Sequence, residues 1–235
     1  MKNNKNTDNK TIFNTIDWHE ILRSYAILVI GLFIMSFGVA LSVKSELGTT
    51  PISCIPNVLK YAVPLSLGMI TIIFNFLLIV IQVIILKNEF QRKQWMQIVV
   101  TVIFGYFIDF ALYILSPVEA TTAVTQWILC IISCFIIALG VYFEVKSEAI
   151  VLPGEGVSLA VRHVTGIEFG KLKTAFDTSN VIIGGVLSIL LYGTFQGIGL
   201  GTIFAGIVVG YIVRFYRRLL DKAFQKKIVK GKENN

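Results

Sequence analysis

Six apolar segments are the feature of this sequence that most restricts its fold. A helix needs about 20 mostly apolar residues to cross a hydrocarbon layer of about 30 Å, and soluble domains rarely contain repeated runs of that length. The segments are residues 24–43, 67–86, 98–115, 127–145, 175–192 and 198–215, and the last is short and rich in glycine. We therefore predict an all-α polytopic membrane protein with six transmembrane helices.

The composition excludes the soluble alternatives. Hydrophobic residues make up 55% of the 235 residues and charged residues only 15%, whereas an average domain has about 25% charged residues. Most of the charge lies in the tails and in short segments between the apolar runs. A water-soluble enzyme, a basic nucleic-acid-binding domain and a disordered chain do not fit this pattern. The first apolar run lacks a small-residue cleavage site, so we expect it to be retained as a span.

Basic residues are distributed unequally between the two sides that six spans create. With both termini on one side, all 21 Lys and Arg residues lie on that side except Lys44 and Lys60. Because Lys and Arg accumulate on the cytoplasmic side, we predict a cell-membrane protein with both termini in the cytoplasm. Residues 1–23 and 217–235 are then cytoplasmic basic tails. For the C-terminal tail a solvated flank is favoured over a specific lipid-binding role, and we expect no nucleic-acid partner.

The sequence contains an internal repeat with an offset of 102 residues. The tetrapeptide V-K-S-E at 43–46 recurs at 145–148, and each copy ends a span and stands five residues before a proline. Several other identities have the same offset, including Gly38 with Gly140. The repeat divides the spans into two halves, residues 24–118 and 126–216.

Each half also contains a short segment, residues 51–63 and 153–165. A helix of 13 residues is about 20 Å long and does not cross a bilayer. We therefore expect re-entrant or interfacial helices, the first interrupted by prolines at 51, 56 and 64. With three spans in each half, the second half is inverted relative to the first. Such 3+3 inverted repeats are typical of transporters that bind substrate near the membrane midplane.

Two motifs in the second half resemble a known family. These are LPGEGVSLAVRHVTGIEFGKLKTAFD at 152–177 and GIGLGTIFAGIVVGYIVRF at 197–215. They resemble the YczE/YyaS/YitT group of bacterial integral membrane proteins, in which a G-x-G-P-x-D-G-L-like loop, a T-G-x-x-x-G segment and a glycine-rich last helix recur. The resemblance extends over residues 31–215 and implies a multi-pass membrane protein of largely undefined activity. Glu155 replaces the usual Asp, and the first half has Ser53 at the equivalent position.

Ionisable side chains inside spans are costly and are the first candidates for a substrate or ion site. Asp109 lies past the middle of the third span on a stripe with Thr101 and Gly105, a small-residue pattern that allows close helix approach. The sixth span has Gly206 and Gly210 at the corresponding positions. For Asp109, proton or cation binding and a structural hydrogen bond to a neighbouring helix are both open.

A second group of polar candidates lies in the fifth and second spans. Asp177 is near the cytoplasmic end of the fifth span in a cluster with Asn180, and its counterpart in the repeat is Asn75. An Asp opposite an Asn would give an asymmetric polar centre between the halves. Because Asp177 is about one turn inside the boundary, solvation or a structural role is favoured over binding.

The short segments and the span ends before them supply the remaining candidates. Glu155 lies in the PGEG turn, where capping of the helix competes with substrate binding, and its charge opposes a simple anion site. Pro51 and Pro153 begin the two short segments, and Glu46 and Glu148 end the preceding spans. We assign these four residues to gating or structure, and ion pairs at the span ends are favoured over gating.

The sequence shows no metal-binding spacing of its Cys and His residues and no nucleotide-binding or hydrolase motif, so we expect no metal, no cofactor and no enzyme. The leading hypothesis is a small secondary transporter or permease for an unidentified solute or ion, with Asp109, Asp177 and Glu155 lining a site between the halves. One alternative is the substrate-capture subunit of an ATPase-driven importer, although the first span lacks the expected Ala-x-x-x-Ala face. Another is a non-transporting accessory factor. The lipid bilayer is an expected partner, and a homo-oligomer stays open.

Overall fold

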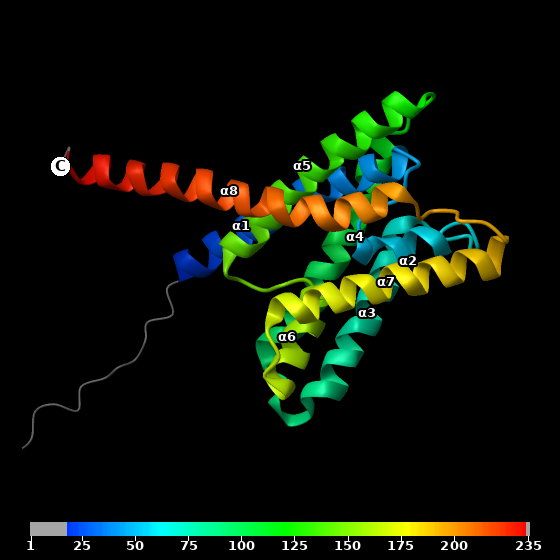
Figure 1. Ribbon diagram of the computed structural model, residues 1–235. Coiled ribbons are helices and arrows are strands. Elements are labelled where there is room, and N and C mark those ends of the chain that lie inside the picture. Colours follow the sequence, from blue (N-terminus) through cyan, green and yellow to red (C-terminus); the bar gives the residue numbers. More distant parts are fainter. Residues whose placement is uncertain (1–17, 234–235) are drawn as a thin grey trace, which may run out of the picture.

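The computed structural model describes residues 18–233, and this part of the chain is a bundle of helices without strands (Figure 1). The helices are α1 Trp18–Lys44, α2 Pro51–Leu59, α3 Leu67–Leu86, α4 Met96–Ile114, α5 Ala123–Ser147, α6 Pro153–Thr165, α7 Phe169–Tyr192 and α8 Leu200–Glu233. Two short 3-10 helices, η1 Lys87–Glu89 and η2 Arg92–Trp95, join α3 to α4. The predictions for residues 1–17 and for the side chains after Asp221 lie outside the described residues.

Five helices of this part are long and apolar enough to cross a membrane. They cover His19–Lys44, Leu67–Glu89, Arg92–Ile114, Ala123–Ser147 and Phe169–Tyr192. These helices confirm the first five predicted apolar segments as helices. Helix α8 is not among the five, so the sixth span stays a prediction. Helix α8 is 34 residues long and extends into the segment that we assigned to the C-terminal tail.

Proline and glycine set the limits of the short helices. Pro51 and Pro153 occupy the first turn of α2 and α6, after residues with extended backbone. Proline suits this place because its fixed φ is helical and its missing N–H has no partner there anyway. Helix α6 has the predicted bounds and is followed by Gly166, whose φ of +71° ends the helix. Helix α2 continues through Pro56 and ends at residue 59, earlier than predicted.

Helices α1 and α5 cross at the centre of the bundle, and glycines allow their close approach (Figure 1). A Cβ atom added at Gly31 would lie 2.9 Å from the carbonyl oxygen of Gly140, and one added at Gly140 would lie 2.7 Å from that of Gly31. The other helices surround this pair: α4 packs on α1, α8 on α5, α2 on α7 and α6 on α3.

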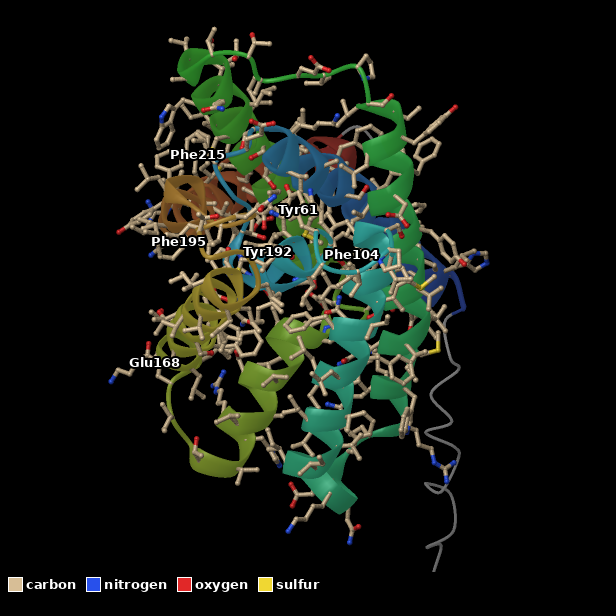
Figure 2. The ribbon with its side chains drawn as sticks, turned by 90° about the vertical axis from the view of Figure 1, so that its right-hand side faces the viewer. Tyr61, Phe104, Glu168, Tyr192, Phe195 and Phe215 are labelled. Atoms are coloured by element: carbon tan, nitrogen blue, oxygen red, sulfur yellow. The ribbon has the colours of Figure 1, made fainter. Side chains whose placement is uncertain are left out.

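Large apolar side chains cover much of the outside of the bundle, and some polar side chains are buried inside it. Gln82 and Gln97 are fully buried between α3 and α4, and the Gln82 amide donates a hydrogen bond of 3.0 Å to Gln97. By contrast, Leu190 is 75% exposed. Phe195 and Phe215 are also exposed and lie at the edge of the molecule in Figure 2. An apolar exterior around polar contacts is what a hydrocarbon environment favours.

Candidate functional site

The N-termini of the two short helices meet inside the bundle beside a large cavity. A Cβ atom added at Gly154 of α6 would collide with the Ile52 side chain of α2, so the absent side chain makes this approach possible. The cavity has a volume of about 700 Å³, and each of the eight α-helices contributes residues to its lining. Ligand pockets usually measure about 300–1,000 Å³. This cavity is the candidate site.

Glu144 connects the end of α5 to the start of α6. The residue is only 3% exposed, and its Oε1 accepts a hydrogen bond of 2.8 Å from the amide of Leu152. Its other carboxylate oxygen accepts no hydrogen bond from a described residue, and Glu144 lines the cavity. The sequence reasoning missed this residue. The available signal was an acidic side chain inside the apolar segment 127–145, which is the criterion that selected Asp109.

Glu155 lies in the first turn of α6 and lines the same cavity. Its carboxylate forms no hydrogen bond or ion pair with the described side chains. Burial raises the pKa of the Glu155 carboxyl, while Lys173 acts against this shift and Asp177 adds to it. A half-buried carboxylate without a positive partner, in the wall of a cavity, is a recognisable feature of binding sites.

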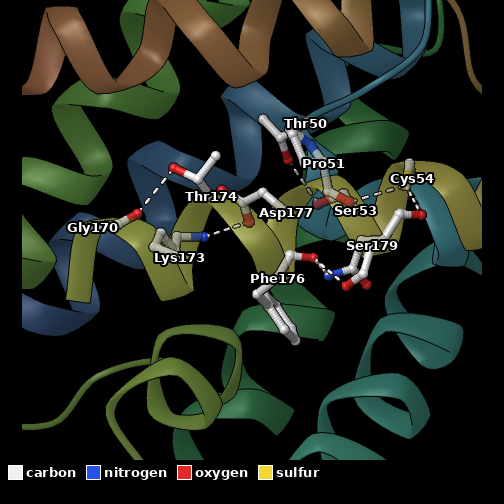
Figure 3. A network of polar contacts seen from close by, with 11 residues as sticks. Thr50, Pro51, Ser53, Cys54, Gly170, Lys173, Thr174, Phe176, Asp177 and Ser179 are labelled. Carbon is white, nitrogen blue, oxygen red and sulfur yellow. Dashed lines mark hydrogen bonds and ion pairs between the residues drawn. The ribbon is translucent and has the colours of Figure 1, made fainter. Parts of the chain in front are cut away.

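Lys173 and Asp177 form an ion pair of 2.7 Å along α7, and both side chains are largely buried. Figure 3 shows this pair beside Thr50 and Ser53 at the start of α2, where the Thr50 hydroxyl donates a hydrogen bond of 3.2 Å to the Ser53 hydroxyl. All four residues line the cavity. The cavity wall therefore combines charged groups of both signs with hydroxyl groups from the two halves of the chain.

Besides Glu155 and Asp177, the cavity lining contains five of the other predicted residues, namely Asn75, Pro51, Glu148, Gly206 and Gly210. Asn75 is 5% exposed, and its side chain forms no hydrogen bond with another described residue. A Cβ atom at Gly206 would lie 2.9 Å from the Pro51 ring, which places α8 next to the start of α2. At Gly210 the added atom would meet open space.

Asp109 of α4 lies outside this cavity, and its side chain contacts the N-terminus of α3. Its Oδ2 accepts a hydrogen bond of 2.5 Å from the Ser66 hydroxyl, and its Oδ1 accepts one of 2.8 Å from the Gly68 amide. These are the contacts of a helix cap supplied by a neighbouring helix. They correspond to the structural alternative that the sequence left open for Asp109.

Asn180 and Pro153 are also absent from the cavity lining. The Asn180 side-chain amide donates a hydrogen bond of 2.9 Å to the Phe176 carbonyl, and the Asn180 carbonyl accepts one of 3.1 Å from the Cys54 thiol. The Pro153 carbonyl accepts a hydrogen bond of 3.2 Å from Gln82. Both residues therefore join a short helix to a long one.

Two predicted residues, Gly105 and Glu46, have not yet been placed, and Glu148 is compared with Glu46 below. Gly105 confirms the expected close approach of α4 to its neighbour, because an added Cβ atom would lie 2.8 Å from the Gly68 carbonyl oxygen of α3. Glu46 lines a second cavity of about 540 Å³ together with Lys60. Neither Glu46 nor Glu148 is in an ion pair with the described side chains, so the ion pairs predicted at the span ends are not seen there.

A polar cluster lies where α8 leaves the bundle beside the end of α5. Lys146 forms an ion pair of 2.9 Å with Asp221, and the Tyr142 hydroxyl donates a hydrogen bond of 3.0 Å to the same carboxylate oxygen. The hydrogen bond from Lys146 lowers the pKa of Asp221, and that from Tyr142 acts in the same direction. All three residues line the cavity. They hold α8 against α5 at this end of the site.

The cavity has no recognisable metal centre. No group of three or more His, Cys, Asp or Glu side chains in the described part of the chain is arranged to hold a metal ion. Cys54, Cys130 and Cys134 are free and buried. The chemistry of the lining is therefore that of carboxylates, amines, hydroxyls and apolar groups.

Helices of membrane-spanning length and an apolar exterior define an all-helical, multi-pass protein of membrane type. The chain belongs to a family of unknown function, DUF6198, which matches residues 22–218. It is 22% identical over 204 residues to an uncharacterized protein, YyaS, of Bacillus subtilis (strain 168). That similarity covers 86% of this chain and 96% of the relative, and it confirms the resemblance to the group that includes YyaS. No solved structure matches the chain.

Proposed function

We propose that this protein is a small secondary transporter or permease and that the cavity beside Gly154 and Ile52 binds its solute. The cavity carries the proposal, because about 700 Å³ far exceeds the voids of a close-packed protein interior. Transporters with inverted repeats bind substrate where the short or broken helices of the two halves meet. We propose no bond-making or bond-breaking step in the cavity and therefore no enzymatic activity.

Equivalent helix contacts in the two halves support the six-span, 3+3 inverted arrangement. Helix α4 packs on α1 as α8 packs on α5, and α6 packs on α3 as α2 packs on α7. The two V-K-S-E copies end in the same backbone conformation, with φ values of 59° at Glu46 and 51° at Glu148. We therefore propose that α8 is the sixth span and the counterpart of α4, with both chain ends on the cytoplasmic side of the cell membrane.

Single-cysteine labelling of intact cells tests the inverted topology. The starting protein has its three native cysteines replaced by alanine. Tyr61 follows α2 and Val164 lies in the last turn of α6, and both are well exposed. We expect Tyr61→Cys to react with a membrane-impermeant maleimide in intact cells and Val164→Cys to react only after permeabilisation. Equal labelling of both in intact cells would contradict the inversion.

Labelling from both sides of the membrane tests transport itself. Thr174 lines the cavity, and Phe195 lies in the loop between α7 and α8. In an alternating-access protein, Thr174→Cys is labelled in right-side-out and in inside-out vesicles, whereas Phe195→Cys is labelled only in right-side-out vesicles. Labelling of Thr174→Cys from one side only would reject alternating access and favour an accessory factor.

The other two functions make different experimental demands. A substrate-capture subunit co-purifies with an ATP-hydrolysing partner, whereas the proposed transporter purifies alone and keeps its two-sided labelling. A docking factor that acts through its basic end loses function when the chain is truncated after Asp221. The proposed transporter tolerates that truncation, because the shortened chain keeps the whole cavity lining.

A further inference from the structure

The inner wall of the cavity has more carboxylates than positive groups. Glu144, Glu155 and Asp177 face a single lysine, Lys173, which forms its ion pair with Asp177. No Lys, Arg or His of the described part of the chain lies within ion-pair distance of Glu144 or Glu155. Two carboxylates in a mostly apolar protein interior are therefore left without a positive partner.

The two unpaired carboxylates are close in the fold. Glu144 holds the Leu152 amide, and Glu155 lies one helical turn beyond Leu152. Like charges at short range in an environment of low dielectric constant are unstable together unless one takes up a proton or a cation lies between them. The cavity has room for such a cation, because its volume of about 700 Å³ is far larger than a hydrated metal ion requires.

The remaining positive groups of the lining form no ion pair with Glu144 or Glu155. Lys146 is in the last turn of α5 and pairs with Asp221. Arg214 and Arg217 are exposed on the outer part of α8, and the Arg214 Nε donates a hydrogen bond of 3.2 Å to the Gly210 carbonyl. These groups belong to the end of the cavity where α8 leaves the bundle.

Besides its charged and hydroxyl groups, the cavity lining contains aromatic and aliphatic side chains. Phe74 of α3 and Phe104 of α4 line the cavity, as do Met35 and Val39 of α1. The face of an aromatic ring attracts a cation, and alkyl groups on that cation gain from burial against apolar side chains. A wall of this kind favours an alkylated ammonium over an inorganic ion.

We propose that the cavity binds a small alkylated ammonium cation, with its charge against Glu144 and Glu155 and its alkyl groups against Phe74 and Phe104. The inference rests on the proposed function, because it takes the cavity as the substrate site, and it adds the chemical class of the substrate. Lys173 and Asp177 form a neutral pair beside the site and leave its net charge negative.

The test is binding of a matched pair of probes to the purified full-length protein. Choline carries a trimethylammonium group, and 3,3-dimethylbutan-1-ol has the same shape without the charge. We expect choline to raise the unfolding temperature in a saturable way, because a ligand that binds only the folded state stabilises it. The alcohol has no such effect. Tetramethylammonium and benzyltrimethylammonium extend the series to smaller and larger cations.

Two variants locate the binding site. Glu155→Gln should weaken choline binding about tenfold, which corresponds to about 1.4 kcal/mol. The control Glu119→Gln removes the same charge from an exposed residue outside this cavity, in the segment between α4 and α5, and should leave binding unchanged. The unfolding temperature of each variant without ligand shows whether it is folded. Absence of binding by all three cations, equal stabilisation by the alcohol, or full affinity in folded Glu155→Gln would overturn the inference.

Failure of this inference is distinguishable from failure of the proposed function. Cation binding with one-sided labelling of Thr174→Cys would keep the ammonium site and reject the transporter. Two-sided labelling without cation binding would keep the transporter and reject this substrate class.

Discussion

The amide of Gly68 donates a hydrogen bond of 2.8 Å to the carboxylate of Asp109, so a side chain of α4 caps the N-terminus of α3. The Ser66 hydroxyl donates to the second carboxylate oxygen. The first amides of a helix have no partner within the helix, and the positive end of the helix dipole favours a carboxylate. Asp109 of α4 therefore helps to fix how α3 and α4 meet.

Replacement of Asp109 should lower stability more than it changes the cavity. We expect Asp109→Ala to lose about 1–2 kcal/mol of unfolding free energy and Asp109→Asn to lose less, because asparagine keeps an acceptor for the Gly68 amide. Thermal unfolding in detergent measures the effect, with Glu119→Ala as the exposed control. An unchanged unfolding temperature in Asp109→Ala, together with loss of Thr174→Cys labelling, would restore the ion-binding role.

A methyl group at the crossing of α1 and α5 should destabilise the bundle. In Gly140→Ala the new Cβ atom meets the backbone of α1 at Gly31, which cannot move independently. We expect a loss of about 1–3 kcal/mol, as for other overpacked sites. Gly210→Ala is the matched control on α8, because its Cβ atom has open space, and better helix propensity should make that change neutral or stabilising. Equal effects of the two changes would show that packing at the crossing is not the cause.

The buried glutamine pair predicts a characteristic double-mutant result. Gln82→Leu removes the partner of Gln97 and of the Pro153 carbonyl, and unpaired buried polar groups cost about 1–3 kcal/mol. The double variant Gln82→Leu with Gln97→Leu should recover part of this loss, because both polar partners are then gone. Chemical unfolding of the two single variants and of the double variant measures the coupling. Strictly additive losses would contradict a direct interaction.

Lys60 should give the protein a pH-dependent stability. Burial, assisted by the charge of Lys44, lowers the pKa of Lys60 to about 8, although Glu46 acts in the opposite direction. In the unfolded chain the pKa is about 10.4, so between these values the unfolded chain binds more protons and stability rises with pH. Below about pH 8 the cost of burying the charged amine is fully present.

The unfolding temperatures of the wild type, Lys60→Met and Lys93→Met between pH 7 and pH 10 test this effect. Lys93 is exposed in η2 and serves as the control. Stability should rise over this range in the wild type and in Lys93→Met, and the rise should be smaller in Lys60→Met. The same rise in all three proteins would place the titration elsewhere.

The helices were largely predictable because apolar run length is a local property. Helix α3 has the predicted bounds of 67–86, and α6 has those of 153–165. Helix α7 begins at Phe169, before the predicted residue 175, because Lys173 is neutralised by Asp177 one turn later and the polar turn can remain helical. A window based on hydropathy counts that lysine as a break and has no information about its partner.

The candidate site was predictable only in part. Glu155 and Asp177 were recognised as ionisable residues near the spans, and both line the cavity. Asp109 satisfied the same criterion but caps α3, since the position of Gly68 beside it depends on how two helices cross. Glu144 was missed although it is an acid within a span, and only its contact with Leu152 relates it to α6.

The sequence by itself determined that the chain forms long apolar helices and two short ones that begin at proline, because hydropathy and backbone restriction act within a few residues. It also fixed the family. Only the tertiary structure decided that the starts of α2 and α6 meet at Ile52 and Gly154 and which acids face the same cavity. Those relationships join residues about a hundred positions apart, and they depend on helix crossings that the close approach of glycine backbones permits.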